Sequence, residues 1–330
     1  MQILNEIVIA KSTMILPETV AQLEERYTVH RLWETEDHDA FITTIRDRVT
    51  GIATEGWAPK SLIDSLPNVQ IIASFGVGFD GVDIHHATQR GITVTNTPDI
   101  LNDEVADFAI GLLLATARGI VTGDHYVRDG RWLQGIMSLK HRVYGQRLGI
   151  LGLGRIGKII ARRAEAFNMI IAYHGRNEQP EVPYRYEQNL VDLVRDSDFL
   201  IVSCIGGETT RNLVNREVLE ALGTSGILIN VARGSVVDEP ALIEALHSGT
   251  IMAAGLDVFA NEPYVPEELI RMNNVVLQPH QSSATKQTRI EMGQVMIENL
   301  DAHFSGKSTL TPVNSILDAT CSASTNQIQL

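Results

Sequence analysis

The sequence predicts an α/β protein with two doubly wound parallel sheets, each covered by helices on both faces. Short apolar runs alternate with helical patterns through the first hundred residues, and the same alternation restarts at Arg147. The chain has 330 residues, 44% of them hydrophobic, which is enough to fill two cores. We therefore expect a discontinuous domain of residues 1–100 and 288–330, and a second domain of residues 101–287.

The first domain is expected to begin with a small sheet. Its apolar runs are bounded by turn residues, and helical segments such as Glu18–Arg26 lie between them. The predicted strands are Ile7–Ala10, Gly51–Ala53, Ile71–Phe75 and Thr93–Thr95.

A long apolar helix is expected to follow this sheet. Asn102 can cap its N-terminus, and the acidic residues Asp103 and Glu104 suit the positive end of the helix dipole. The body, Val105–Ala117, is nearly all apolar. A helix that is apolar all round is buried, so we expect it to lie between the domains.

The second domain is expected to contain six strands with helices such as Lys158–Phe167 and Glu239–His247 between them. A helix around Lys286–His303 then returns the chain to the first domain, which places a cleft between the two. The tail after Ser305 is polar and is expected to add no chemistry. The predicted strands are Leu148–Leu151, Ile170–Tyr173, Phe199–Cys204, Gly226–Val231, Ala253–Val258 and Asn274–Leu277.

A glycine turn joins the first strand of the second domain to its helix. Gly152 allows a tight turn, Gly154 lets the backbone approach a pyrophosphate, and Gly157 lets the helix pack closely. This pattern predicts a dinucleotide site. Its expected residues are Gly152, Leu153, Gly154, Arg155, Ile156 and Gly157.

The same glycine spacing occurs earlier, at residues 76–81. Charge separates the two turns, because the earlier one carries Asp80 and Asp83 where the later one carries Arg155 and Lys158. We therefore assign the cofactor to the later turn. The earlier turn is either a plain glycine turn of an α/β unit or a loop with another role.

The end of the second strand of this domain bears on cofactor choice. An NAD site normally places an acidic residue there to bind the ribose hydroxyls. The chain instead reads Tyr173-His174-Gly175-Arg176-Asn177, with no acid. Arg176 can pair with a 2′-phosphate and Asn177 can donate a hydrogen bond, unless Arg176 is simply a solvated loop residue. We predict NADP(H) as the preferred cofactor, with NAD(H) possible.

Three polar clusters follow late strands of the second domain. They supply a guanidinium at Arg233, a carboxylate at Glu262 and an imidazole at His280. In a parallel sheet the carboxyl ends of the strands share one edge with the glycine turn. The clusters span residues 230–239, 255–263 and 278–285.

Taken in order, these motifs resemble the D-isomer-specific 2-hydroxyacid dehydrogenase family, in its glyoxylate and hydroxypyruvate reductase branch, over about residues 45–315. The resemblance implies a flavodoxin-like substrate domain and a Rossmann cofactor domain. It also implies reduction of small 2-oxo acids, such as glyoxylate or hydroxypyruvate, to D-2-hydroxy acids by hydride transfer to C2.

The resemblance also implies roles for individual residues. Arg233 would hold the substrate carboxylate and C2 oxygen, His280 would be the acid/base, and Glu262 would orient and charge it. A planar guanidinium suits a 2-oxo acid, and a nearby carboxylate favours an imidazolium that can donate a proton. The backbone N–H groups of Val77 and Gly78 would bind the substrate carboxylate, which gives the earlier glycine turn its role.

Further cofactor contacts follow from the same resemblance. Asp257 would bond the nicotinamide carboxamide or simply cap a turn. The chain departs from the family at residues 281–283, where a glycine is usual. It also departs at residues 205–208, where many relatives have prolines, so the loop of residues 205–208 is expected to be more mobile. The implied contacts are Gly175, Arg176, Asn177, Ile205, Thr210, Val231, Asp257, Ser282 and Ser283.

A homodimer is the expected assembly. The apolar helix from Val105 and the segment Gly119–Tyr144 resemble the dimerisation region of the family. Trp132 resembles a substrate-side tryptophan that a partner's arm supplies in some relatives, or it is a core or interface anchor.

Composition narrows the other possibilities. A formal charge of −13 disfavours a nucleic-acid or acidic-membrane partner, and the N-terminus contains no apolar run long enough to span a bilayer. The cysteines, Cys204 and Cys321, and the pair His85-His86 show no metal-ligand spacing. We expect reduced thiols, no metal and a cytoplasmic location.

Two other functions use similar motifs. An NAD(H)-sensing, corepressor-like interaction protein is the main alternative, because an intact Arg233, Glu262 and His280 set does not exclude it. An S-adenosylmethionine methyltransferase also uses a glycine turn but leaves the three late clusters unexplained.

Overall fold

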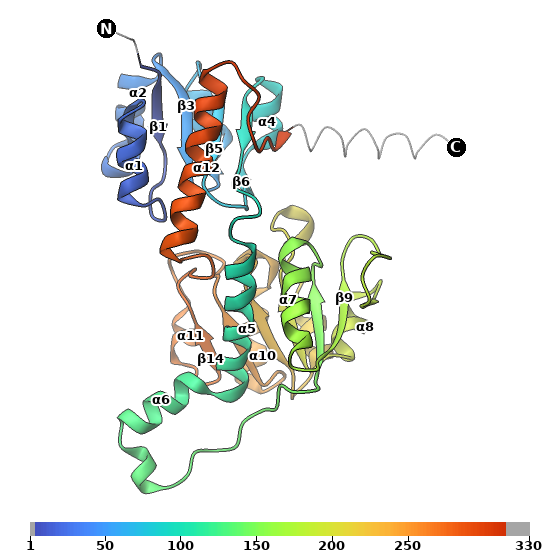
Figure 1. Ribbon diagram of the computed structural model, residues 1–330. Helices are drawn as coiled ribbons and strands as arrows, with labels where there is room; N and C mark the ends of the chain where they lie inside the picture. Colours follow the sequence, from blue (N-terminus) through green and yellow to red (C-terminus); the bar gives the residue numbers. More distant parts are fainter. Residues whose placement is uncertain (1–3, 315–330) are drawn as a thin grey trace. The chain divides into compact units, whose positions relative to one another are not determined.

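The computed structural model describes residues 4–314 of the chain (Figure 1). Residues up to Leu101 and from Thr285 form a first unit, and Asn102–Ala284 form a second. The boundaries expected from the sequence were at residues 101 and 288.

The described part of the first unit contains a five-stranded parallel sheet of order β2-β1-β3-β5-β7. With its strands numbered along the chain, this is the 2-1-3-4-5 order of flavodoxin-like sheets. The edge strand β2 was not expected, because its sequence Thr-Val-His-Arg is half exposed and has no apolar run. The strands are β1 (Glu6–Ile9), β2 (Thr28–Arg31), β3 (Val49–Thr54), β5 (Ile71–Ser74) and β7 (Thr93–Thr95); β4 (Trp57–Ala58) and β6 (Gly81–Val82) form a separate parallel pair.

Helices cover both faces of this sheet. One core joins strand residues such as Ile52 and Ile72 to α2–α4, and the long helix α12 packs against β5 on the other face. The first residues of the predicted polar tail lie beside β7, where Val313 N–H donates to the Val94 carbonyl over 2.7 Å. Residues 315–330 lie outside the described part of the chain. The helices are α1 (Pro17–Glu24), η1 (Leu32–Glu34), α2 (His38–Ile45), α3 (Lys60–Ser65), α4 (Ile84–Gln89) and α12 (Lys286–Phe304).

The second unit contains a seven-stranded parallel sheet of order β10-β9-β8-β11-β12-β13-β14. Its first six strands have the 3-2-1-4-5-6 order of a Rossmann domain, and β14 adds a seventh. Six strands were predicted; the missed one, β10, has only two residues and is partly exposed. The strands are β8 (Arg147–Leu151), β9 (Ile170–His174), β10 (Arg185–Tyr186), β11 (Phe199–Val202), β12 (Ile227–Asn230), β13 (Ala253–Leu256) and β14 (Val275–Leu277).

The long apolar helix α5 packs against α7 and strands β12–β14 of the second unit. Asn102, expected to cap it, is its first helical residue. The helix exposes only a narrow stripe that includes Asp103, Asp107 and Gly111, so its contacts within the second unit account for its apolar sequence. The helices are α5 (Asn102–Arg118), α6 (Ile120–Arg128), η2 (Arg131–Gln134), α7 (Arg155–Glu165), α8 (Leu190–Arg195), η3 (Glu208–Thr210), α9 (Arg216–Leu222), η4 (Gly234–Val236), α10 (Glu239–Ser248) and α11 (Glu267–Arg271).

The segment from α6 to β8 extends away from the rest of its unit (Figure 1). No residue of α6 is buried. The segment exposes many large apolar side chains, including Trp132, Leu133 and Leu139. Between residues 4 and 314, no single helix is long and apolar enough to cross a membrane; only α5 and α6 together, bent by 56°, meet the length and composition criteria.

Candidate active site

The glycine turn after β8 has the shape that its sequence predicts. Gly152 has φ +97°, and a Cβ added to it would lie 2.5 Å from the Cα of Cys204. A Cβ added to Gly157 would overlap the Gly152 carbonyl oxygen. At Gly154, by contrast, an added Cβ would have no neighbour within 4 Å, so open space lies where a pyrophosphate would approach. The turn therefore fits a dinucleotide.

The helix α7 begins at this turn. Gly154 is its N-cap and has no capping side chain, and the first helical bond runs from Lys158 N–H to the Gly154 carbonyl. The N–H groups of Arg155, Ile156 and Gly157 therefore have no acceptor within the helix, and the dipole favours an anion there.

Two side chains that the sequence did not single out hold the turn. Ser203 Oγ donates to the Gly152 carbonyl over 2.9 Å, and Gln179 Nε2 donates to the carbonyl of the buried Leu153 over 2.8 Å. They come from the loops after β11 and β9, so no local pattern marks them.

Arg176 and Asn177, which follow β9, are exposed. Within the described chain, Arg176 has neither a hydrogen-bond nor an ion-pair partner. The adjoining backbone is held by Tyr186, whose Oη donates to the Gly175 carbonyl over 3.2 Å. The guanidinium of Arg176, with Asn177 beside it, is thus available to a phosphate.

Glu262 and His280 form a hydrogen-bonded pair. His280 Nδ1 and Glu262 Oε2 are 2.8 Å apart, and the side chains are 27% and 34% exposed. Glu262 Oε1 also accepts a 3.1 Å bond from Phe259 N–H. Burial, the largest influence, favours the neutral acid, yet the hydrogen bond and charge of His280, the Phe259 N–H and the charge of Arg233 hold the pKa of Glu262 below its ordinary value. The pair leaves Nε2 of His280 available to a substrate.

Asp257 fixes the loop that carries His280. Its oxygens accept bonds from Gln281 N–H (2.7 Å) and Ser282 N–H (3.0 Å), and His280 N–H donates to its carbonyl over 2.9 Å. Its side chain is fully buried, and burial raises the pKa of Asp257 although these N–H groups oppose the shift. Of its two expected roles, the geometry supports the turn cap. The loop holds His280 at φ +54°, an uncommon conformation for a non-glycine residue.

Arg233 follows β12 and is held by a residue that was not predicted. The buried Asn230 donates from Nδ2 to the Arg233 carbonyl over 3.0 Å and accepts a 3.0 Å bond from Ala232 N–H. A Cβ added to Gly234 would overlap the Phe259 backbone, so the Arg233 turn lies directly against the loop that leads to Glu262. A signal for Asn230 existed, because it is a polar residue that ends the apolar run Ile-Leu-Ile of β12.

Strand register brings these groups to one edge of the sheet. Leu151, Val202, Asn230, Leu256 and Leu277 are successive register partners across β8, β11, β12, β13 and β14. The glycine turn and the loops of Arg233, Glu262 and His280 all follow these level strand ends.

The remaining predicted cofactor residues lie in the same set of loops. Thr210 Oγ1 donates to the Ile205 carbonyl over 2.8 Å and so closes the loop after β11, where Ile205 is exposed. Val231, Ser282 and Ser283 are buried. Their contacts with a cofactor stay predictions.

In the first unit, the loop after β5 presents unpaired donors. Among residues 4–314, the N–H groups of Val77 and Gly78 have no acceptor. The loop is held by Asn96, which donates from Nδ2 to the Val77 carbonyl over 3.0 Å, and by Thr97 Oγ1, which accepts from Gly76 N–H over 2.9 Å. Two adjacent free N–H groups on a fixed loop suit a carboxylate.

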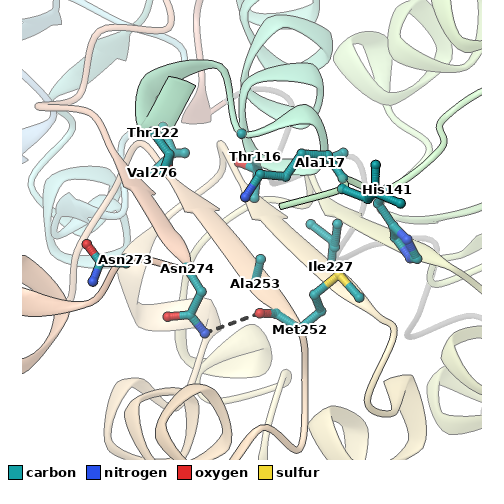
Figure 2. A pocket seen from close by; sticks show the side chains of 13 residues that line it. Thr116, Ala117, Thr122, His141, Ile227, Met252, Ala253, Asn273, Asn274 and Val276 are labelled. Carbon is teal, nitrogen blue, oxygen red and sulfur yellow. Dashed lines mark hydrogen bonds between the residues drawn. The ribbon is translucent and has the colours of Figure 1, made fainter. Parts of the chain in front are cut away.

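A cavity of about 360 Å³ lies at the opposite edge of the second unit's sheet (Figure 2). Its walls include Ile227 and Ala253, the first residues of β12 and β13, and Thr116 near the end of α5. Asn274 Nδ2 donates to the Met252 carbonyl there over 3.2 Å. The cavity is remote from the strand ends that carry Arg233 and His280. Nowhere in the described residues do three or more His, Cys, Asp or Glu side chains form a group able to hold a metal.

Comparison with known proteins agrees with this arrangement. Residues 110–282 match the family model of the D-isomer specific 2-hydroxyacid dehydrogenase NAD binding domain. Glyoxylate/hydroxypyruvate reductase A HPR2 of Arabidopsis thaliana is 48% identical over 88% of this chain and 94% of its own. Hydroxyphenylpyruvate reductase of Plectranthus scutellarioides is 45% identical over the same shares. The NADPH-dependent glyoxylate/hydroxypyruvate reductase of Sinorhizobium meliloti, solved with NADP and malonate, aligns with a TM-score of 0.87 at 44% identity, over 94% of this chain and 97% of that one.

Proposed function

The chain belongs to the D-isomer-specific 2-hydroxyacid dehydrogenase family, in its glyoxylate reductase branch, and we propose that it uses NADPH to reduce small 2-oxo acids to D-2-hydroxy acids. One observation carries the proposal. The Glu262–His280 pair and Arg233 follow strand ends that are level with the glycine turn. A histidine that can donate a proton and a guanidinium therefore lie at the same sheet edge as the dinucleotide site.

The proposed mechanism assigns one task to each side chain. The bound nicotinamide supplies the hydride that adds to C2 of the 2-oxo acid. Arg233 binds the carboxylate and the C2 oxygen in a planar, charge-assisted contact. His280 Nε2 donates the proton that converts this oxygen to a hydroxyl, while Glu262 holds Nδ1 and stabilises the imidazolium before transfer. The free N–H groups of Val77 and Gly78 support a role in carboxylate binding.

The proposed preference for NADPH rests on the end of β9. No acidic residue follows His174 directly, and Arg176 is exposed without a partner in the described chain. A carboxylate at this place would repel a 2′-phosphate, whereas a guanidinium attracts it. The Sinorhizobium meliloti relative is NADPH-dependent, which agrees with the proposal.

We also propose a homodimer in which a second copy covers the exposed segment of residues 119–144. Its Leu133 and Leu139 are 94% and 97% exposed, and Trp132 is also exposed. The cavity in Figure 2 continues this surface, because Leu139 is one of its walls. A monomer rarely leaves so large an apolar surface in water.

The test of the reaction is a reductase panel. Glyoxylate, hydroxypyruvate, phenylpyruvate and 2-ketogluconate are each supplied with NADPH or NADH, and nicotinamide absorbance is followed. We expect turnover of at least one acid, with NADPH preferred. Cofactor binding without turnover of any acid would favour the corepressor-like alternative, which the relatives do not favour. A cytoplasmic location stays a prediction.

A further inference from the structure

Three loops lie side by side at the carboxyl edge of the first unit's sheet. Ile9, Ala53 and Ala73 are register partners across β1, β3 and β5, so these strands end at the same level. The loop after β1 contains Met14, the loop after β3 begins with Glu55, and the loop after β5 presents the free N–H groups of Val77 and Gly78. Residues of the first two loops are therefore neighbours of the proposed carboxylate site.

Met14 is fixed at both of its peptide groups. Glu55 Oε1 accepts bonds from Met14 N–H and from Ile15 N–H, the latter over 3.1 Å, while Glu55 Oε2 accepts a 2.6 Å bond from Thr13 Oγ1. From the other side, Arg289 Nη1 donates to the Met14 carbonyl over 3.2 Å. A carboxylate and a guanidinium thus hold one short loop at consecutive positions, and the half-buried Met14 side chain stands on a rigid backbone.

Arg289 is only 7% exposed, and its guanidinium carbon lies 5.7 Å from the centre of the Phe75 ring. Burial lowers the pKa of Arg289, while the charge of Glu55 opposes that shift. Burying a cation costs free energy. An uncharged donor would be enough if the loop only had to be closed. Phe75 directly precedes the loop of Val77 and Gly78. Arg289 therefore contacts both the loop of Met14 and the start of the loop that carries the proposed carboxylate site.

We propose that Met14 forms the wall against which the C3 part of the 2-oxo acid packs, and that Glu55 and Arg289 are the positioning residues that hold it there. The inference rests on the proposed reductase function and deepens it, because it names the residue that sets which 2-oxo acids fit. Glyoxylate has only hydrogen at this place, hydroxypyruvate has a hydroxymethyl group, and phenylpyruvate has a benzyl group. A flexible thioether accepts the first two and restricts the third.

The test uses Met14→Ala and Met14→Phe in the full chain. For each protein, the ratio of kcat/KM for phenylpyruvate to kcat/KM for glyoxylate is measured in one preparation, so the folded fraction cancels. We expect Met14→Ala to raise the ratio about tenfold or more and Met14→Phe to lower it by a similar factor, since pocket size discriminates by roughly 10–200-fold. Met272→Ala, at a half-buried methionine that directly follows α11 in the second unit, is the matched control and should leave the ratio unchanged.

The positioning residues have their own readout. Arg289→Met removes the donor to Met14 and should raise KM for hydroxypyruvate several-fold, while kcat for glyoxylate and the Kd for NADPH stay close to wild type. Arg289→Lys should restore much of the loss.

Ratios that do not move in either Met14 variant would overturn the inference and leave the reductase function standing. Loss of all turnover in both variants at an unchanged Tm would also overturn it, because Met14 would then serve every substrate alike. A wild-type chain that reduces none of these acids would remove the proposed function and this inference together.

Discussion

Glu262 Oε2 lies 2.8 Å from Nδ1 of His280, and the same carboxylate has its pKa held below the ordinary glutamate value. Burial, the largest influence on this carboxyl, acts in the opposite direction, so the bond and charge of His280 outweigh it together with the smaller contributions of Phe259 N–H and Arg233. The Glu262 carboxylate is thus ionised where it holds Nδ1 of His280.

This coupling predicts the pH behaviour of Glu262→Gln. Because the pKa of Glu262 is depressed, its charge and the stability it contributes are fully present above the unfolded pKa and are lost only as pH falls through the folded value. The carboxylate is therefore ionised throughout neutral and alkaline pH. Removing it should move the alkaline limb of kcat/KM for 2-oxo acid reduction to lower pH, because the imidazolium that donates the proton loses its hydrogen-bonded counter-charge.

The measurement is the pH profile with a deuterated cofactor as a check that hydride transfer limits the rate. Glu268→Gln, an exposed residue on α11, is the matched control. A profile that does not move in Glu262→Gln, with chemistry limiting, would remove Glu262 from the proton-transfer pair.

Arg233→Ala should nearly abolish reduction while cofactor binding persists. Loss of a charge-assisted, two-point contact is expected to cost about 3–5 kcal/mol, or roughly two to nearly four decades in kcat/KM. Arg233→Lys should recover only part of this, because an ammonium lacks the planar fork. The Kd for NADPH, measured by fluorescence, should change less than twofold.

The control for this variant is Arg216→Ala, which breaks an exposed ion pair with Glu244 on α9 and α10. Near-normal steady-state reduction by Arg233→Ala would contradict the role of Arg233.

The parts of the site that sequence reasoning found share one property: they are encoded locally. The glycine turn of residues 152–157 is a short pattern between an apolar strand and a helix, and Arg233, Glu262 and His280 each follow an apolar strand. The parallel arrangement then places all four at one edge without further information. The edge strands β2 and β10 were missed because they are short and partly exposed, so they lack the apolar run that marks a strand.

The parts that were missed depend on contacts between distant segments. Gln179 holds Leu153 from another loop, and Arg289 bonds the backbone of Met14 across 275 positions of sequence. No periodicity records such a contact. Asn230 is an intermediate case, since a polar residue at the end of Ile-Leu-Ile was visible but its bond to the Arg233 carbonyl was not.

The exposed segment of residues 119–144 leads to a prediction about assembly. Leu133 and Leu139 are almost fully exposed, so Leu133→Asp with Leu139→Asp should cost the single chain little. In a dimer the same carboxylates would be buried without partners, and the dimer Kd should rise by roughly a hundredfold or more. Sedimentation over a concentration series measures this, with Ile270→Asp on α11 as an exposed apolar control. A wild-type chain that stays monomeric at high micromolar concentration would contradict the proposed dimer.

The last prediction concerns Arg176, whose guanidinium is exposed and unpaired in the described chain, where an NAD site would carry an acid. An ionic contact with a 2′-phosphate is expected to contribute about 1.5–3 kcal/mol, which corresponds to a roughly tenfold to more than hundredfold preference for NADPH over NADH in kcat/KM. Binding of 2′,5′-ADP compared with 5′-AMP isolates the phosphate from the rest of the reaction and should show the same preference. Arg176→Ala should collapse both preferences, whereas Arg195→Ala, which breaks an exposed ion pair on α8, should change neither. Because the two measurements share only the 2′-phosphate, equal use of both cofactors by the wild type, or an unaltered preference in Arg176→Ala, would show that Arg176 is a solvated loop residue.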